Sequence, residues 1–415
     1  MVRRSLGEGG SPAVPKGVVA AAGASAFGAP GLQPRGNTSG LARAQDRSGP
    51  ATYNHLMSAL SEAAVLDALR VVKDPDLHKD IVTLGFVKNL RLRGGEVAFT
   101  IELTTPACPV KDLLRDQAHA VVAALPGVSR VDIEMTAAVR ATSPVGGRVP
   151  IEGVKNIIAV GAGKGGVGKT TMAVNLAAAL ARRGSRVGIL DGDIYGPNVP
   201  IMLGLRTQLQ TDGQKILPAE GHGIQAVSVG FLTDDDAPII WRGPMLHQTI
   251  QQFFREVRWD NLDYLIVDMP PGTGDVALSL SQSVAVAGAV LVTTPQTVSV
   301  ADTRRAVHMY RKLNIPTLGL IENMSHFVCA GCGREADVFG KGGGEALAHE
   351  LSVPFLGHVP LQERVRSAGD AGHPVVLADP DSAPAVAIMA AAERVAQQVS
   401  IASFASRAIP MTEVR

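Results

Sequence analysis

The chain has 415 residues, with 39 Lys and Arg against 38 Asp and Glu, so its formal net charge is +1. Hydrophobic residues make up 46% and charged residues 19%, which excludes a wholly disordered chain and allows a packed core. Because acids and bases balance, no general charge attracts nucleic acid or an anionic membrane, and we expect neither as a partner.

The apolar stretches and the cysteines narrow the class further. The longest purely apolar runs, such as the one near Val284 to Val292, hold about nine or ten residues, and a bilayer needs roughly 18 to 20. Cys108, Cys329 and Cys332 are too few and too unevenly placed for the disulfide framework of a secreted domain. We therefore expect a cytoplasmic protein, and its length predicts two or three domains.

Residues 1–56 are dominated by Gly, Ala, Ser, Pro and Arg, and their only acids are Glu8 and Asp46. We expect a disordered tail or a translated upstream leader, since Met57 would serve equally well as a start codon. A targeting segment is the alternative, because the stretch contains Arg and is poor in acids, although it has no clear amphipathic helix.

A small α/β domain is predicted over residues 57–140. Two runs, Val87–Arg93 and Glu96–Leu103, flank Gly94–Gly95, and this pattern indicates a β-hairpin because both turn residues tolerate a positive φ. The other predicted elements are a helix that Ser61 caps and that ends near Asp74–Pro75, a helix over Val110–Leu125 and a strand over Val128–Met135.

Residues 141–150, rich in Pro and Gly, are predicted to link this domain to a second one over 151–400, which a tail over 401–415 follows. The second domain begins as a βαβ unit, and further apolar runs alternate with helical stretches. The sequence therefore predicts an α/β fold with a mostly parallel sheet and helices on both faces. The predicted strands are Asn156–Val160, Arg186–Leu190, Tyr264–Val267, Ala289–Thr293, Thr317–Ile321 and Phe355–Val359, with a first helix over Lys169–Arg183.

A glycine-rich turn, Gly163–Thr170, matches the G-x-x-x-x-G-K-[ST] pattern and stands after a strand and at the start of a helix. Backbone N–H groups of such a loop converge on phosphate oxygens, Lys169 reaches the β- and γ-phosphates, and the Thr170 hydroxyl can ligate Mg²⁺. The sequence thus predicts a P-loop NTPase. The residues expected to bind nucleotide here are Gly163, Lys164, Gly165, Gly166, Val167, Gly168, Lys169, Thr170 and Thr171.

Lys164 is a second lysine inside the loop. The loop resembles the deviant Walker A signature of the MinD/ParA/nitrogenase-iron-protein class, in which this lysine crosses a dimer interface to the partner's nucleotide. The resemblance implies a nucleotide-dependent homodimer. The alternative is an exposed lysine that only adds positive charge near the phosphates.

Acidic loops follow two further strands, with Asp191 and Asp193 after the first and Asp268 after the second. A carboxylate there can hold Mg²⁺ or orient the attacking water, although a lone Asp at a strand end is often a turn or helix cap. By similarity to the same class, Asp193 positions the water, Asp268 is the Walker B acid with Asp191 adjacent, and Pro270–Gly274 is switch II. We expect the catalytic residues Lys164, Lys169 and Asp193, and the Mg²⁺-binding residues Thr170, Asp191 and Asp268.

Asn323 occupies the position that reads the adenine edge in related ATPases. Because the guanine-reading sequence N-K-x-D is absent, we expect ATP as the nucleotide. A second glycine-rich stretch, Gly340–Gly344, also looks phosphate-like, but no hydroxyl residue follows its lysine. It is predicted to be a flexible loop before a helix over Glu345–Leu351.

Cys329 and Cys332 form a C-x-x-C pair that a general ATPase does not need. Two thiolates at this spacing can bind one metal centre, but a closed zinc site and a [4Fe–4S] cluster each take four ligands. His326 is a candidate third ligand, and no fourth is obvious, so either the site is incomplete or two chains share it. A zinc-bridged dimer and a redox disulfide are the alternatives to a shared cluster.

These motifs together closely resemble the Mrp/ApbC-type iron–sulfur cluster carrier ATPases. The resemblance covers about residues 57–380 and includes Trp241–Met245, Asn323–Ser325 and Phe339–Gly344. Ahead of them, Asp74–Leu77 and Thr105–Pro109 resemble the small iron–sulfur assembly domain often fused to that ATPase. The family implies a labile [4Fe–4S] cluster bridging two subunits, ATP hydrolysis that regulates the carrier, and partners that are apo iron–sulfur proteins and cluster scaffold proteins.

The chain departs modestly from the family pattern, with His326 where an aromatic is usual and Ala330 where proline is common. Cys108 is a weaker candidate for handling a cluster, because a lone small residue is as often a packing residue. The chief rival function is a ParA/MinD-like spatial organiser, which shares the P-loop and its acids. That function gives no reason for the cysteine pair, and residues Ala383 to Ala405 include no strongly basic amphipathic helix of the membrane-targeting kind.

Overall fold

The computed structural model describes residues 60–142, 148–194, 196–232, 243–272, 275–329 and 331–407, and every statement below concerns these residues. The predicted tail over 1–56 lies outside them, as do residues 143–147 of the predicted linker. Trp241 and Arg242 of the family motif, Thr273 and Gly274 of the expected switch II, and Ala330 also lie outside.

The first part of the chain forms a sheet of three strands, β1 (Val87–Arg93), β2 (Glu96–Leu103) and β3 (Arg130–Ala137). The predicted hairpin is confirmed, because β1 pairs antiparallel with β2 across Gly94–Gly95, and β3 then pairs parallel with β2. Alternate residues of β2 are buried together with apolar residues of α1 (Glu62–Leu69) and α2 (Lys111–Ala123). This is the alternation expected of a strand with one face on a core.

The first helix is shorter than predicted. The Ser61 Oγ accepts a hydrogen bond from the N–H of Ala64, as expected of a cap, but α1 ends at Leu69, before the expected end near Asp74–Pro75. The backbone after α1 pairs with a later segment instead, because the Val72 carbonyl accepts a hydrogen bond of 3.0 Å from the Ile81 N–H and the Asp74 N–H donates one of 2.9 Å to the Lys79 carbonyl. The Asp74 carboxylate then accepts hydrogen bonds from the N–H groups of Asp76 and Leu77 in the turn between the paired residues.

The second sheet contains nine of the described strands, in the order β13-β12-β11-β4-β10-β5-β9-β8, with β14 also paired to β12. All pairs are parallel except those that β8 and β13 make, so the predicted fold class is confirmed. The strands are β4 (Val154–Ala162), β5 (Val187–Asp191), β8 (Ala219–Gly221), β9 (Ile224–Val227), β10 (Leu262–Asp268), β11 (Val286–Thr293), β12 (Thr317–Val328), β13 (Glu335–Ala336) and β14 (Phe355–Leu361). A separate hairpin joins β6 (Gln210–Thr211) and β7 (Ile216–Leu217).

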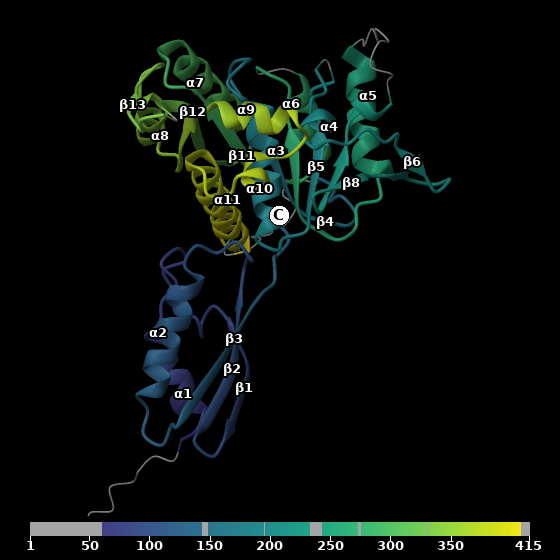
Figure 1. The fold of residues 1–415 in the computed structure, drawn as a ribbon. Helices are drawn as coiled ribbons and strands as arrows, with labels where there is room; N and C mark the ends of the chain where they lie inside the picture. The colour runs from purple at the N-terminus through teal and green to yellow at the C-terminus, as the bar shows by residue number, and fades with distance from the viewer. Residues whose placement is uncertain are drawn as a thin grey trace, which may run out of the picture. The chain divides into compact units, whose positions relative to one another are not determined.

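Helices cover both faces of this sheet (Figure 1). Buried residues of α3, α4, α10 and α11 pack on one face, and buried residues of α6, α7 and α8 pack on the other. The bounds are α3 (Lys169–Arg182), α4 (Val199–Met202), α5 (Gly243–Glu256), α6 (Asp275–Ser283), α7 (Thr297–Lys312), α8 (Gly343–Leu351), α9 (Glu363–Asp370), α10 (Val375–Ala378) and α11 (Ala383–Arg407), with a 3-10 turn η1 (Val229–Phe231).

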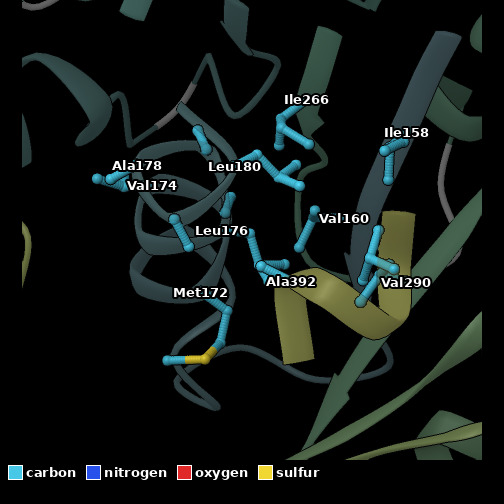
Figure 2. Close-up of a cluster of buried hydrophobic side chains, with 14 of the residues drawn as sticks. Ile158, Val160, Met172, Val174, Leu176, Ala178, Leu180, Ile266, Val290 and Ala392 are labelled. Atoms are coloured by element: carbon cyan, nitrogen blue, oxygen red, sulfur yellow. The ribbon is translucent and has the colours of Figure 1, made fainter. Parts of the chain in front are cut away.

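Strand β4 shows why both faces carry helices. Ile158 and Val160 belong to the core on the α3 side, whereas Ile157 and Ala159 belong to the core on the other side, so every residue of the strand centre is apolar. Figure 2 shows the first core, where side chains of α3 such as Leu176 meet those of the central strands and of α11. This arrangement holds the start of α3, and therefore the loop before it, against the sheet.

Helix α11 continues to Arg407, past residue 400, where we expected the C-terminal tail to begin. In the part of the chain that the structure describes, no helix has both the length and the apolar character needed to cross a membrane.

Two valines of α11 provide a matched test of this packing. Val395 is fully buried against the α3 side of the sheet, whereas Val386 is 55% exposed. We expect Val395→Ala to lower the free energy of unfolding by about 2 kcal/mol, because it removes buried methyl groups and leaves a cavity. Val386→Ala should change it by less than about 0.5 kcal/mol. Urea denaturation followed by tryptophan fluorescence measures both, and equal effects would contradict the described packing of α11.

Candidate functional site

The loop between β4 and α3 has the backbone that phosphate binding requires. Gly166 and Gly168 have φ angles of +81° and +84°, which residues with a Cβ adopt rarely. A Cβ at Gly163 would lie 2.3 Å from the carbonyl carbon of Asp302, because the loop packs directly on α7. The glycines of the motif are therefore needed both for the turn and for close contact with a neighbouring helix.

A buried ion pair lies at the start of α3. The Lys169 Nζ is 2.7 Å from Oδ1 of Asp268, and the Thr170 hydroxyl donates a hydrogen bond of 2.7 Å to the other carboxylate oxygen. Asp268 has no exposed surface and Lys169 is only 7% exposed. Burial raises the pKa of Asp268, and the charge of Lys169 and its hydrogen bond oppose that rise.

The two acids that follow β5 differ in their surroundings. Asp193 lies 3.8 Å from the Lys169 Nζ, and its pKa is raised by burial and lowered in part by that lysine. Asp191 is fully buried, and burial together with the charge of Asp268 raises its pKa to about 7. Its oxygens accept hydrogen bonds from the N–H groups of Asp193 and Val199 and from the Ser228 hydroxyl, at 3.1, 3.3 and 3.0 Å.

The oxygen atoms present fit a magnesium ion. A threonine hydroxyl and a carboxylate in contact, as in Thr170 and Asp268, are hard oxygen donors of the type that Mg²⁺ takes beside phosphates. Asp191 lies opposite Asp268 on the neighbouring strand, and its oxygens accept hydrogen bonds from the chain, as those of Asp268 do. It is therefore a third oxygen donor beside Thr170 and Asp268, and it also holds the loop that carries Asp193.

The other two residues expected at the nucleotide lie on the same loop or touch it. Lys164 is exposed on the loop surface, in contrast to the buried Lys169. Asn323 is almost fully buried, and its side-chain amide donates a hydrogen bond of 2.9 Å to the carbonyl oxygen of Val167. Strand β12 thus brings Asn323 into direct contact with the phosphate loop.

The cysteine pair lies on the turn between β12 and β13, which pair antiparallel. The turn is closed by a hydrogen bond from the Cys329 N–H to the Arg334 carbonyl at 3.0 Å, and by one from the Gly333 N–H to the Cys329 carbonyl at 2.8 Å. The pKa of the Cys329 thiol is lowered by hydrogen bonds from the backbone N–H groups of Cys332 and Gly331 and from the Cys332 side chain. Cys329 is partly exposed and Cys332 exposed, so both are open to solvent.

This turn supplies two sulfur ligands and no more. Among the described residues, no group of three or more His, Cys, Asp or Glu side chains is placed to hold a metal ion. His326, the candidate third ligand, has its Nδ1 atom 2.8 Å from the Ser325 hydroxyl. Within one chain the described residues therefore supply two of the four ligands that a closed zinc site or a [4Fe–4S] cluster takes.

Cys108 has a different environment from this pair. Its side chain is partly buried, and this burial raises the pKa of its thiol to about 11. A protonated thiol is a poor nucleophile and a poor metal ligand. Near neutral pH the Cys108 thiol is therefore a weaker nucleophile and ligand than the Cys329 thiol, whose pKa is lowered.

Two polar residues near the site were missed by the sequence reasoning. Ser228, at the end of β9, donates to Asp191 and accepts a hydrogen bond from the N–H of Gly230. Glu322 precedes Asn323 in β12 and has no exposed surface. In the sequence, each is a polar residue at the end of an apolar run that predicts a strand. This pattern does not reveal their partners, which are far away in sequence.

Two family models match the chain. The model described as NUBPL iron-transfer P-loop NTPase matches residues 153–396, and the model described as iron-sulfur cluster assembly protein matches residues 62–134. The first match covers the P-loop, the acids of the site, Asn323 and the cysteine pair. The second covers the three-stranded sheet up to residue 134.

Curated relatives and a solved structure are also similar. An iron-sulfur cluster carrier protein of Synechocystis sp. is 49% identical over 83% of this chain and 99% of its own length. The chloroplastic Fe-S cluster assembly factor HCF101 of Arabidopsis thaliana is 41% identical over 87% of this chain and 70% of its own length. A nucleotide-binding protein from Archaeoglobus fulgidus, solved in complex with ADP, is 34% identical over 54% of this chain and 88% of its own, with a TM-score of 0.48.

The contrast among the thiols can be tested by alkylation. With iodoacetamide near neutral pH, we expect Cys329 to react at least about tenfold faster than Cys108, because the pKa of the Cys329 thiol is lowered, whereas partial burial raises that of Cys108. Peptide mass spectrometry measures both rates. In urea, which removes the folded environment, the rates should converge, and equal rates in the folded chain would contradict the described environments.

Proposed function

This chain belongs to the family of NUBPL-type iron-transfer P-loop NTPases, and from this premise we propose that it is an ATP-hydrolysing carrier of iron–sulfur clusters. The observation that carries the proposal is the exposed two-thiolate turn at the end of β12, the strand that also places Asn323 on the phosphate loop. The relatives named iron-sulfur cluster carrier protein support it further. A spatial organiser of the ParA/MinD kind would leave the two cysteines without a role.

We propose the following roles in ATP hydrolysis. Lys169 binds the β- and γ-phosphates, and Asp193, 3.8 Å from its Nζ, orients the attacking water. Thr170 and Asp268 hold Mg²⁺, which when bound neutralises charge on the phosphates. Lys164, exposed on the loop, reaches the nucleotide of a second subunit. Asp191 fixes the backbone that carries Asp193.

The cargo is held between two subunits. A [4Fe–4S] cluster takes four thiolates, and each chain supplies Cys329 and Cys332, so a homodimer with twofold symmetry completes the coordination. Because both thiols are open to solvent, such a cluster stays accessible to a receiving protein. The partners proposed are therefore apo iron–sulfur proteins, together with scaffold proteins that supply the cluster.

We also propose the division of the chain into an assembly domain over 57–140, a linker over 141–150 and an ATPase domain from 151. The separate matches of two family models support that division. A cytoplasmic, reducing compartment suits cysteines that are all free in the described residues.

Anaerobic reconstitution with iron and sulfide tests the cargo. The purified chain should become brown and bind about four iron atoms per dimer, and Cys329→Ser or Cys332→Ser should abolish both changes because each removes two of the four ligands in a dimer. Cys108→Ser is the matched control and should keep the iron content. A colourless protein that holds one zinc per monomer would refute the proposed cargo.

Three lysine variants test the nucleotide site. Lys169→Ala should lower ATP turnover at least about 100-fold, since it removes the main cation at the transferred phosphate. Lys164→Ala should impair turnover and largely retain nucleotide binding, and Lys312→Ala on the exposed end of α7 should change neither. Phosphate release and equilibrium binding of a fluorescent ATP analogue measure these effects. Unchanged turnover in Lys169→Ala would refute the phosphate-loop assignment, and unchanged turnover in Lys164→Ala would refute the contact in trans.

A further inference from the structure

Glu322 is a buried carboxylate that no role described so far uses. It lies in β12 directly before Asn323, and its exposed fraction is 0%. Its Oε1 accepts a hydrogen bond from the N–H of Gly342 at 2.9 Å, and its Oε2 accepts one from the N–H of Gly344 at 2.6 Å. The Nδ1 atom of His358, on β14, lies 3.0 Å from Oε1.

The second glycine-rich stretch, Gly340–Gly344, binds this carboxylate through its backbone. Gly342 has a φ of +82°, and a Cβ on Gly344 would lie 2.8 Å from a methyl group of Thr293 and 3.2 Å from the Cβ of Glu322. The N–H groups that made this stretch look phosphate-like therefore point at a side chain of the protein itself. The sequence-based expectation of a flexible loop is wrong here, because a fully buried carboxylate requires such fixed donors.

These contacts place Glu322 at the foot of the β12–β13 hairpin that carries Cys329 and Cys332, which we call the cysteine hairpin. From Glu322 the chain continues along β12 to Val328, passes through Cys329 and Cys332, and returns through β13 to the same carboxylate at Gly342 and Gly344. Both ends of the excursion are thus tied to one side chain. A displacement of Glu322 along β12 therefore moves both ends of the cysteine hairpin at the same time.

The residue next to Glu322 also contacts the phosphate loop, Gly163–Thr170. Asn323, the next residue, donates its side-chain amide to the Val167 carbonyl, and a Cβ on Gly168 would lie 2.3 Å from the Asn323 Nδ2. Beyond Asn323 the strand is irregular, since Met324 has a φ of +55° and the pairing of β12 with β14 shifts register between Asn323 and Phe327. A regular ladder resists such local adjustment, whereas an irregular one offers a place where the hairpin can reorient.

We propose that Glu322 is a positioning residue that couples occupancy of the phosphate loop to the geometry of Cys329 and Cys332. This inference rests on the proposed function in taking the loop as an ATP site and the cysteines as cluster ligands. Nucleotide that engages the Asn323 amide withdraws it from Val167 and shifts β12 at that point. Glu322 transmits the shift to Gly342 and Gly344, so that both arms of the hairpin move as a unit.

Cysteine alkylation in the full, reduced, iron-free chain tests this coupling. The rate of iodoacetamide modification at Cys329 and Cys332 is measured by peptide mass spectrometry with and without Mg²⁺ and a non-hydrolysable ATP analogue. In the unaltered chain we expect the analogue to change the rate about fivefold or more, the range typical of coupled sites. In Glu322→Gln that ratio should fall to about one, because the amide of Gln presents a donor to one glycine N–H, while analogue affinity stays within about threefold.

The control is Glu350→Gln on α8. It makes the same chemical change as Glu322→Gln, at an exposed carboxylate that pairs with Arg304. It should retain the full ratio. If Glu322→Gln fails to bind the analogue, Glu322→Asp replaces it, since this variant keeps the charge and is too short to reach both glycines. Loss of binding in both variants would overturn the proposal by making Glu322 a purely structural residue.

The other outcomes are equally decisive. A full ratio in Glu322→Gln, or a ratio of one in the unaltered chain, would overturn the coupling. Neither result depends on iron, so a chain that fails to bind a cluster refutes the proposed function and leaves this measurement valid. Conversely, normal reconstitution together with a Glu322→Gln ratio equal to that of the unaltered chain refutes only the inference.

Discussion

The parallel register of β10 determines the arrangement of the whole site. Asp268, its last residue, lies opposite Val160 of β4 on one side and opposite Asp191 of β5 on the other. The pairing therefore places two buried carboxylates side by side at the edge where the phosphate loop begins. Two like charges in a buried setting are unfavourable unless they are compensated, and Lys169, Thr170, Ser228 and backbone N–H groups provide that compensation.

Features with local causes were predictable from the sequence. The turn at Gly94–Gly95 and the loop at Gly163–Thr170 are defined by residues adjacent in the chain, and the alternation in β4 reveals two covered faces. Helix α1 ends earlier than predicted, because the backbone of Val72 and Asp74 pairs with that of Ile81 and Lys79. These partners lie further along the chain, and the position of Pro75 alone did not reveal them.

Features that depend on distant partners were not predictable. Ser228 meets Asp191 across 37 residues, and Glu322 meets Gly344 across 22, so neither residue forms a recognisable spacing pattern. The stretch Gly340–Gly344 shows the difficulty well, because N–H groups that bind a carboxylate need the same glycines as N–H groups that bind a phosphate. Only the position of Glu322 distinguishes the two uses. That one chain offers only two closely spaced cysteines, Cys329 and Cys332, was in contrast visible from the sequence itself.

The contact between Lys169 and Asp268 also affects what an affinity for nucleotide would mean. The ammonium is already neutralised within the protein before any phosphate arrives, so nucleotide entry exchanges one counter-ion for another. The measured affinity is then a difference between two electrostatic attractions, and it understates the strength of each. Simple inorganic anions, which bring no base or ribose to add further contacts, gain little from such an exchange. The resting counter-ion at Lys169 thus contributes to the selectivity of the loop together with its glycine backbone.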